Sequence, residues 1–301
     1  MGRSYVVLLL SLSAIWGASY LFIKVGVRDL EPAAFVELRL LVTVPVLVGF
    51  LVVREGAARA ARELGAAARA GLVLGAINAA VPFALIAWGE RHIDSGVAAI
   101  ANATVPLFNF LIALRFAPTE RIGGARFSGL IVGIAGVAVL AGLHPRGGWW
   151  AVAGTLAVVL ASLLYAAGGI YGQHQTTRRS GPVLAAATVL YGAVILLPFA
   201  LLQLPGGVPG WKSLASAVAL GVAGTGIAQL LLFRMLRLHG SARTSLVTYL
   251  LPLFAVVYGS TLLGEPLTAE EIGGMALIFV GVAIASGLVR LPRRAPLTQT
   301  P

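Results

Sequence analysis

Residues 240–288 read GSARTSLVTYLLPLFAVVYGSTLLGEPLTAEEIGGMALIFVGVAIASGL, two apolar runs on either side of the short acidic connection GEPLTAEE. Each run is long enough to cross a hydrocarbon core of about 30 Å as an α-helix. A closely similar phrase, SGVAAIANATVPLFNFLIALRFAPTERIGGARFSGLIVGIAGVAVLAG, occupies residues 95–142. The repetition predicts an internal duplication of a membrane-spanning bundle.

The two phrases can be aligned along their whole length. Pro106 corresponds to Pro252 at an offset of 146, whereas Glu120 corresponds to Glu265 at an offset of 145. One residue has therefore been lost between these two points. Because the shared phrase recurs in both halves of the chain, we expect the two halves to be built alike.

The composition excludes a soluble globular domain. Of the 301 residues, 58% are hydrophobic and 11% are charged, so a soluble fold would leave many apolar side chains facing water. The chain contains no cysteine, which excludes disulfides, thiolate metal sites and a cysteine nucleophile. The net charge of +11 could indicate nucleic-acid binding, but the basic residues are spread among loops. We therefore expect no nucleic-acid partner, and we attribute the charge to membrane topology.

Ten apolar segments predict an all-α integral membrane protein with ten transmembrane helices. The segments cover residues 5–27, 33–53, 68–89, 94–115, 126–143, 150–172, 182–204, 213–236, 240–263 and 270–290. The first continues past Phe22 without a small-residue cleavage site, which favours a spanning helix over a signal peptide. Five helices per half is an odd number, so the second half enters the membrane from the opposite side. The sequence thus predicts two inverted-topology repeats, residues 1–145 and 146–291, and a basic tail, residues 292–301.

The basic residues predict the orientation of these repeats, because Lys and Arg collect in cytoplasmic loops. With a cytoplasmic N-terminus, sixteen Lys and Arg residues fall in loops on the inner side, and Arg39 lies within a helix. Five fall on the outer side: Lys24, Arg28, Arg91, Arg146 and Lys212. Both termini and the tail are therefore predicted to be cytoplasmic.

Several motifs resemble those of the EamA-type drug/metabolite transporters. They are Trp16-Gly17-Ala18-Ser19, the spacing from Pro32 to Arg39, and the Pro-Leu-Phe…Gly-Glu-x-x-Thr…Gly phrase. The first half departs from this phrase at residues 117–119, where Ala-Pro-Thr precedes the glutamate. Among such proteins the chain is most similar to the YddG-type bacterial amino-acid exporters.

This resemblance implies a function as well as a location. It implies a multi-pass transporter of the bacterial inner membrane that exports amino acids, aromatic and apolar ones included, and related small metabolites. Inverted repeats suit alternating access around a site near the midplane. A transporter of drugs, sugar derivatives or other metabolites with the same fold is the alternative.

Enzymatic signatures are missing from the sequence. The closest approach to a phosphate loop is GGVPGWKS at residues 206–213, where Trp211 separates the glycine from the lysine. The four histidines are scattered among loops, so we expect no metal site. We therefore expect a non-enzyme without a cofactor. Its partners are then a small-molecule substrate and membrane lipid, and its state is a monomer or a homodimer.

Polar residues inside the first two segments are candidates for the transport site. Trp16, Tyr20 and Lys24 recur at i, i+4 and i+8, which places them on one helix face and suggests substrate binding. Lys24 and Glu37 lie at similar depth and could pair, although Lys24 could instead extend to the membrane surface. Glu37 is the only carboxylate that we expect to be buried, and so the one candidate for proton coupling. Arg39 faces away from Glu37, and the resemblance, which also has an arginine at this position, implies a gating or structural role for Arg39; Glu37 is assigned to the same class as the residue that could neutralise Lys24.

The fourth and ninth segments carry matched polar faces. Asn102, Pro106 and Asn109 recur at i, i+4 and i+7, and a mid-span proline frees a carbonyl one turn earlier. The matching positions of the ninth segment are Thr248, Pro252 and Ala255, with Tyr249 beside them. We expect the asparagines, Thr248 and Tyr249 to bind substrate and the prolines to bend paired helices around its path. The alternative is that the prolines are packing kinks.

Three other segments add substrate-binding candidates, Asn78, Tyr165 and Gln229, and Pro82 as a further gating proline. Any single residue of this kind could instead hold two helices together by a hydrogen bond. As a set they predict an aromatic, hydrogen-bonding cavity with few charges, which suits a small amphipathic solute.

The fifth and tenth segments differ from all the others. They carry small residues, Gly129, Gly133 and Gly136 in one and Gly274 and Gly281 in the other, and almost no polar side chains. Such faces allow two helices to pack closely. We expect these segments to form a scaffold or a dimer contact outside the substrate pathway.

Overall fold

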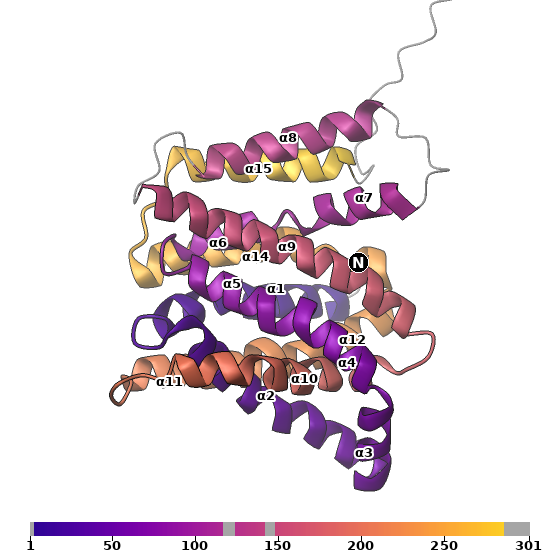
Figure 1. Cartoon of the computed structure of the whole chain (residues 1–301). Coiled ribbons are helices and arrows are strands. Elements are labelled where there is room, and N and C mark those ends of the chain that lie inside the picture. The colour runs from indigo at the N-terminus through magenta and orange to yellow at the C-terminus, as the bar shows by residue number, and fades with distance from the viewer. Residues whose placement is uncertain (1–2, 117–123, 142–147, 286–301) are drawn as a thin grey trace, which may run out of the picture.

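The chain folds into a bundle of long helices that run between two opposite ends (Figure 1). The computed structural model describes residues 3–116, 124–141 and 148–285, and these contain helices and no strand. The first-half elements are α1 (Arg3–Gly26), α2 (Pro32–Glu55), α3 (Ala57–Ala66), α4 (Ala68–Gly75), η1 (Ala76–Ala80), α5 (Val81–Gly89), α6 (Ser95–Asn102), α7 (Val105–Phe116) and α8 (Gly124–Ala141). The second-half elements are α9 (Trp149–Gln175), α10 (Gly181–Leu202), α11 (Trp211–Ala219), η2 (Leu220–Ile227), α12 (Ala228–His239), α13 (Ser241–Thr244), α14 (Val247–Tyr258), η3 (Gly259–Leu263) and α15 (Ala269–Ala285).

The predicted all-helical membrane fold is confirmed. Seven helical stretches among the described residues are long and apolar enough to cross a membrane. Two further apolar helices are shorter, Phe127–Leu140 and Val247–Leu263. The described part of each predicted segment is mainly helical, but the number of ten spans and the orientation of the termini stay predictions. The tail at residues 292–301 and the departure at residues 117–119 lie outside the described residues.

Several predicted spans are interrupted. Short π-helical turns, η1 and η2, join α4 to α5 and α11 to α12, and η3 ends α14. The span predicted at residues 94–115 breaks between Asn102 and Val105, and Pro106 lies in the first turn of the new helix, where its missing N–H costs nothing. Pro252 instead lies inside α14. The two prolines therefore occupy different places in their helices.

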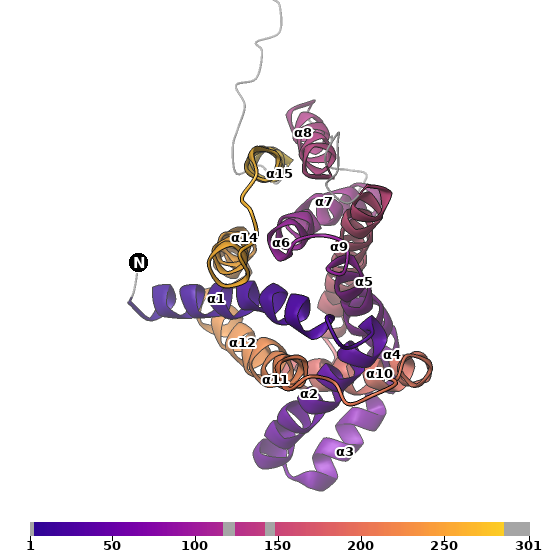
Figure 2. The same ribbon diagram turned by 90° about the vertical axis from the view of Figure 1, so that its left-hand side faces the viewer.

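The helices α8 and α15 form a pair at one edge of the bundle, and α3 lies at the opposite edge (Figures 1 and 2). The expected close packing of α8 and α15 is confirmed. A Cβ added to Gly281 would lie 2.4 Å from the Gly133 backbone nitrogen, and one added to Gly136 would lie 2.7 Å from the Ile278 nitrogen. Only glycine permits such contact between two backbones.

One end of the bundle is held together by polar contacts between its connections; we call it the tied end. It comprises residues 27–31, 90–94, 203–210 and 264–268, at the left of Figure 1. The Ser213 hydroxyl donates to the Asp29 carboxylate at 2.7 Å, which links α11 to the turn after α1. Arg91 pairs with Glu31. The charge distribution predicts that this end faces the periplasm.

Candidate substrate-binding cavity

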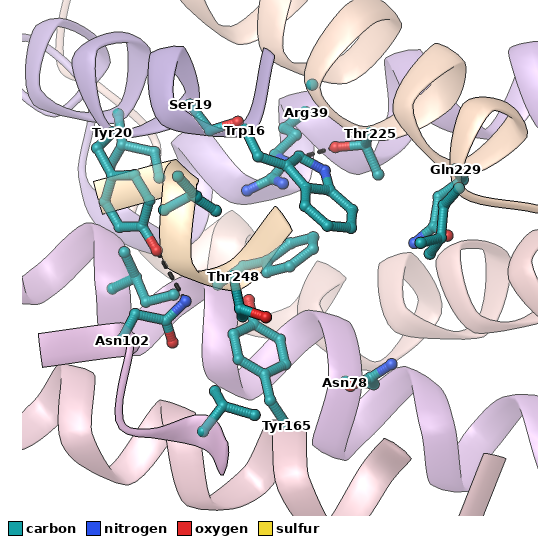
Figure 3. Close-up of a pocket in the computed structure, with 17 residues that line it drawn as sticks. Trp16, Ser19, Tyr20, Arg39, Asn78, Asn102, Tyr165, Thr225, Gln229 and Thr248 are labelled. Atoms are coloured by element: carbon teal, nitrogen blue, oxygen red, sulfur yellow. Dashed lines mark hydrogen bonds between the residues drawn. The ribbon is translucent and has the colours of Figure 1, made fainter. Parts of the chain in front are cut away.

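A cavity of about 330 Å³ lies at the centre of the bundle, walled by helices of both halves (Figure 3). This volume is at the lower end of the range for small-molecule sites, which run from about 300 to 1,000 Å³. Seven of the ten predicted substrate-binding residues line it: Trp16, Tyr20, Asn78, Asn102, Tyr165, Gln229 and Thr248. The structure thus brings together side chains from α1, η1, α6, α9, α12 and α14.

The α1 face lies along one wall of the cavity, where Trp16 and Tyr20 are separated by one helical turn. The Tyr20 hydroxyl accepts a hydrogen bond from Asn102 Nδ2 at 2.8 Å (Figure 3). Asn102 Oδ1 in turn accepts from the Ser162 hydroxyl at 3.0 Å. This chain joins α1, α6 and α9, and it fixes the orientation of the amide that ends α6.

Arg39 contributes a positive charge to the cavity wall. Its Nε donates to the Thr225 hydroxyl at 2.9 Å, and its guanidinium carbon lies 3.7 Å from the centre of the Phe83 ring. The residue is only 6% exposed, and among the described residues its two terminal nitrogens have no hydrogen-bond acceptor. A buried guanidinium with free donors is suited to bind a carboxylate.

The π-helical turns shape the facing wall. Asn78 belongs to η1, and Gly224 and Thr225 belong to η2. A Cβ on Gly224 would lie 3.0 Å from the Ser19 hydroxyl oxygen, so α1 and η2 approach closely here. Such turns shift the register of the side chains that follow, and they are frequent at functional sites.

The EamA-like transporter family matches residues 3–142 and 152–287. The chain belongs to the EamA-like transporter family. This places it among transporters, and it confirms the resemblance seen in the sequence.

Relatives of this EamA-like transporter carry transporter names. One is the "Uncharacterized inner membrane transporter YedA" of Escherichia coli strain K12, 30% identical over 97% of this chain and 94% of that protein. Another, from Salmonella typhimurium strain LT2, is a "Probable amino-acid metabolite efflux pump", 26% identical over 94% of this chain and 95% of that protein. The expected multi-pass inner-membrane location is thereby confirmed.

A solved structure titled "Crystal structure of protein" shares the fold. It superposes with a TM-score of 0.65 at 19% identity, covering 95% of this chain and 98% of that chain. The bundle of this EamA-like transporter is thus one that another chain also adopts.

Some predicted site residues of this EamA-like transporter lie outside the cavity. Asn109 is exposed on α7, and Tyr249 packs edge-on against Phe279 of α15 at 6.0 Å between ring centres. The gating prolines also lie away from the cavity wall: Pro82, Pro106 and Pro252. Their gating role stays a prediction.

The suggested pairing of Lys24 with Glu37 is wrong. The Lys24 amino group donates to the backbone oxygens of Glu90 at 2.9 Å and Ile93 at 2.7 Å, and it lies 4.0 Å from the Asp94 carboxylate. Glu90 caps the end of α5 and Ile93 lies in the connection to α6, so their carbonyls lie outside the helix and a cation from α1 satisfies them. Lys24 therefore contacts the tied end and is not among the residues that line the cavity.

The expectation that Glu37 is the only buried carboxylate is also wrong. Glu37 is 5% exposed, whereas Glu90 is fully buried, and neither oxygen of Glu90 has a hydrogen-bond partner among the described residues. Glu90 directly follows the predicted span that ends at Gly89, so the sequence suggested a position in a loop. Its burial depends on contacts between residues far apart in the sequence, which a local sequence pattern does not reveal.

Other cavity residues were missed by the sequence interpretation. Ser19 stands inside the Trp16-Gly17-Ala18-Ser19 motif and could have been found there. Arg39 was assigned to gating, although it also lines the cavity. Phe83 and the aliphatic lining residues carry no sequence signal, because apolar side chains are common throughout these helices.

Proposed function

We propose that this EamA-like transporter exports amino acids, including aromatic and apolar ones, and related carboxylate-bearing metabolites by alternating access. The observation that carries the proposal is the free guanidinium of Arg39 in the cavity wall. The guanidinium contacts the Thr225 hydroxyl and the Phe83 ring, neither of which cancels its charge. A solute that brings a carboxylate would supply the missing counter-charge.

The rest of the wall suits the other parts of an amino acid. Among the described residues that line the cavity, no carboxylate occurs. An ammonium group could bind to amide and hydroxyl oxygens, such as those of Asn78 and Gln229, or to an aromatic face such as that of Trp16. An apolar or aromatic side chain would find Phe83 and Tyr165.

The relatives support the same class of solute. The name of the Salmonella typhimurium relative refers to amino-acid metabolites, and that protein aligns with nearly the whole of this chain. The cavity volume of about 330 Å³ also suits a solute of this size.

A drug or sugar-derivative transporter of the same fold remains the alternative. A cationic drug would be repelled by Arg39 without an acidic residue in the described wall to attract it. A sugar phosphate would bring two negative charges to a wall in which Arg39 is the one described cation.

Transport by purified protein in liposomes tests the proposal. The panel pairs each labelled amino acid with the amine that lacks its carboxylate, for example phenylalanine with phenylethylamine, with and without a pH gradient. We expect uptake of the acids and little uptake of the amines. Arg39→Gln should lower uptake of the acids about ten-fold or more, because a hydrogen bond to a charged group is worth about 1.5–3 kcal/mol.

Arg28→Gln is the matched control, because Arg28 is exposed outside the cavity. It should transport like the wild type. Equal transport of acids and amines, or a fully active Arg39→Gln, would rule out the carboxylate site. Efflux from loaded cells then tests the outward direction.

A further inference from the structure

Glu90 is a buried acid that the solute cavity does not use. It lies in the turn that follows α5, with a side chain that is 0% exposed. Neither carboxylate oxygen receives a hydrogen bond within the described residues, although its backbone oxygen accepts one from Lys24. An ionised carboxylate left without hydrogen bonds in such a place keeps an uncompensated desolvation penalty. The closed surroundings therefore favour the protonated acid.

A second carboxylate, Glu265, holds the neighbouring helix. Gly264 adopts a left-handed conformation, φ 70°, which turns the chain so that Glu265 reaches the N-terminus of α6. The Glu265 carboxylate accepts from the Ser95 hydroxyl at 2.6 Å and from the Ser95 backbone N–H at 3.0 Å. A carboxylate that accepts backbone N–H groups at a helix N-terminus stabilises the helix, so Glu265 holds the start of α6.

The charged groups around Glu90 decide how readily it ionises. Burial raises the pKa of Glu90 well above its ordinary value, Lys24 and Arg39 lower it, and the negative charge of Glu265 raises it. The titratable and charged groups that face it or share its turn are Tyr20, Lys24, Arg39, Arg91, His92, Asp94 and Glu265. Burial dominates this balance, and the positive charges of Lys24 and Arg39 only partly offset it.

We propose that Glu90 is a proton-binding site that holds the tied end closed when protonated and favours its opening when ionised. The inference rests on the alternating access of the proposed function. A charge on Glu90 would oppose Glu265 and attract the Lys24 amino group away from the carbonyls of Glu90 and Ile93. Both effects loosen the contacts that join α1, α6 and the connection before α15.

The pH dependence of closing follows from the difference in the pKa of Glu90 between the closed and open forms. In the open form Glu90 reaches water and titrates near the ordinary value for glutamate, about 4.3. In the closed form its pKa is raised by burial, so closing takes up a proton. The closed form is favoured most at low pH, and its advantage falls as the pH rises above about 4.3 toward the raised pKa. Opening releases the proton to the water at the tied end.

The absence of native cysteines permits a direct measurement of opening. Ile93, 6% exposed, lies in the tied end and outside the cavity wall, so Ile93→Cys should react with a maleimide in detergent only when this end opens. Val208→Cys, at a residue 96% exposed in the same end, corrects for the pH dependence of thiol reactivity. The rate ratio of the two cysteines is measured from pH 5 to pH 9.

We expect this ratio to rise several-fold with pH. Glu90→Gln should keep the rate ratio low at every pH. Glu90→Met also lacks the charge and should give the same result, which guards against a folding defect caused by the amide alone. Glu37→Gln is the matched control because Glu37 is a buried carboxylate in another helix, and it should keep the rise. Monodisperse gel filtration shows that each variant is folded.

Two outcomes would overturn the proposal. A pH-dependent ratio that persists in Glu90→Gln and Glu90→Met would assign the titration to another group and leave alternating access untouched. A wild-type ratio that stays low at every pH would contradict both the Glu90 switch and opening of the tied end. Carboxylate-selective uptake in liposomes is measured separately, so a failure at Arg39 is distinguishable from a failure at Glu90.

Discussion

The α8–α15 pair and the central cavity are built from corresponding helices of the two halves, yet they pack in opposite ways. In the pair, glycine lets two backbones touch, as Gly281 does against Gly133. Around the cavity, side chains such as Trp16 and Tyr165 stand between the helices and leave about 330 Å³ open. The size of the residues that face each other between corresponding helices therefore decides the outcome. Glycines let α8 and α15 pack as a scaffold, whereas larger side chains keep the other helices apart and enclose a site.

The largest expected effect is a loss of stability at the α8–α15 pair. Gly281→Ala places a Cβ 2.4 Å from the Gly133 nitrogen and 2.7 Å from the Gly129 oxygen, where backbone atoms cannot move aside. We expect a loss of about 1–3 kcal/mol of stability, seen as a lower thermal midpoint and a lower folded yield.

Gly273→Ala is the matched control for this substitution. Its Cβ would have a single neighbour at 3.9 Å, an ordinary contact with Val139. Alanine also favours a helix over glycine by about 0.8–1.0 kcal/mol, so this variant should be no less stable than the wild type. If the two variants behave alike, close backbone contact does not stabilise the pair.

The sequence predicted much of this comparison. The small-residue faces of α8 and α15 are visible as regularly spaced glycines, and the spacing of Trp16 and Tyr20 places both residues on one face. The sequence-based prediction failed where the rotation of a helix about its axis, or a contact between residues far apart in the sequence, decides where a side chain lies. Asn109 matches Asn102 in spacing, but the chain breaks after Asn102, so the two no longer share a face.

The next effect is expected in the cavity. Trp16→Ala removes an aromatic wall from the proposed site, which should lower transport about ten-fold, since a cation–π or stacking contact is worth about 1–2 kcal/mol. Folded yield should change little, because Trp16 borders an open space. Transport in liposomes and thermal midpoints of the same preparation check both expectations.

Tyr249→Ala is the counterpart outside the cavity. Tyr249 packs against Phe279 of α15, so its loss should lower stability and leave the affinity for the solute unchanged. The opposite pattern, with a loss of yield for Trp16→Ala and a loss of affinity for Tyr249→Ala, would reverse the assignment of the two residues.

The smallest expected effect is a coupling energy between Lys24 and Glu37. Lys24→Met should destabilise the protein because the carbonyls of Glu90 and Ile93 lose a charged donor, a cost of about 1.5–3 kcal/mol. Glu37→Gln should cost little by itself, because no described residue donates to Glu37 Oε2.

Since the two side chains share no contact, the double variant should show the sum of the two losses within about 0.5 kcal/mol. A double variant more stable than Lys24→Met alone by over about 1 kcal/mol would reveal a direct ion pair between them. Thermal unfolding of the three variants and the wild type at one pH completes the cycle, and an additive result means that Lys24 stabilises the protein independently of Glu37.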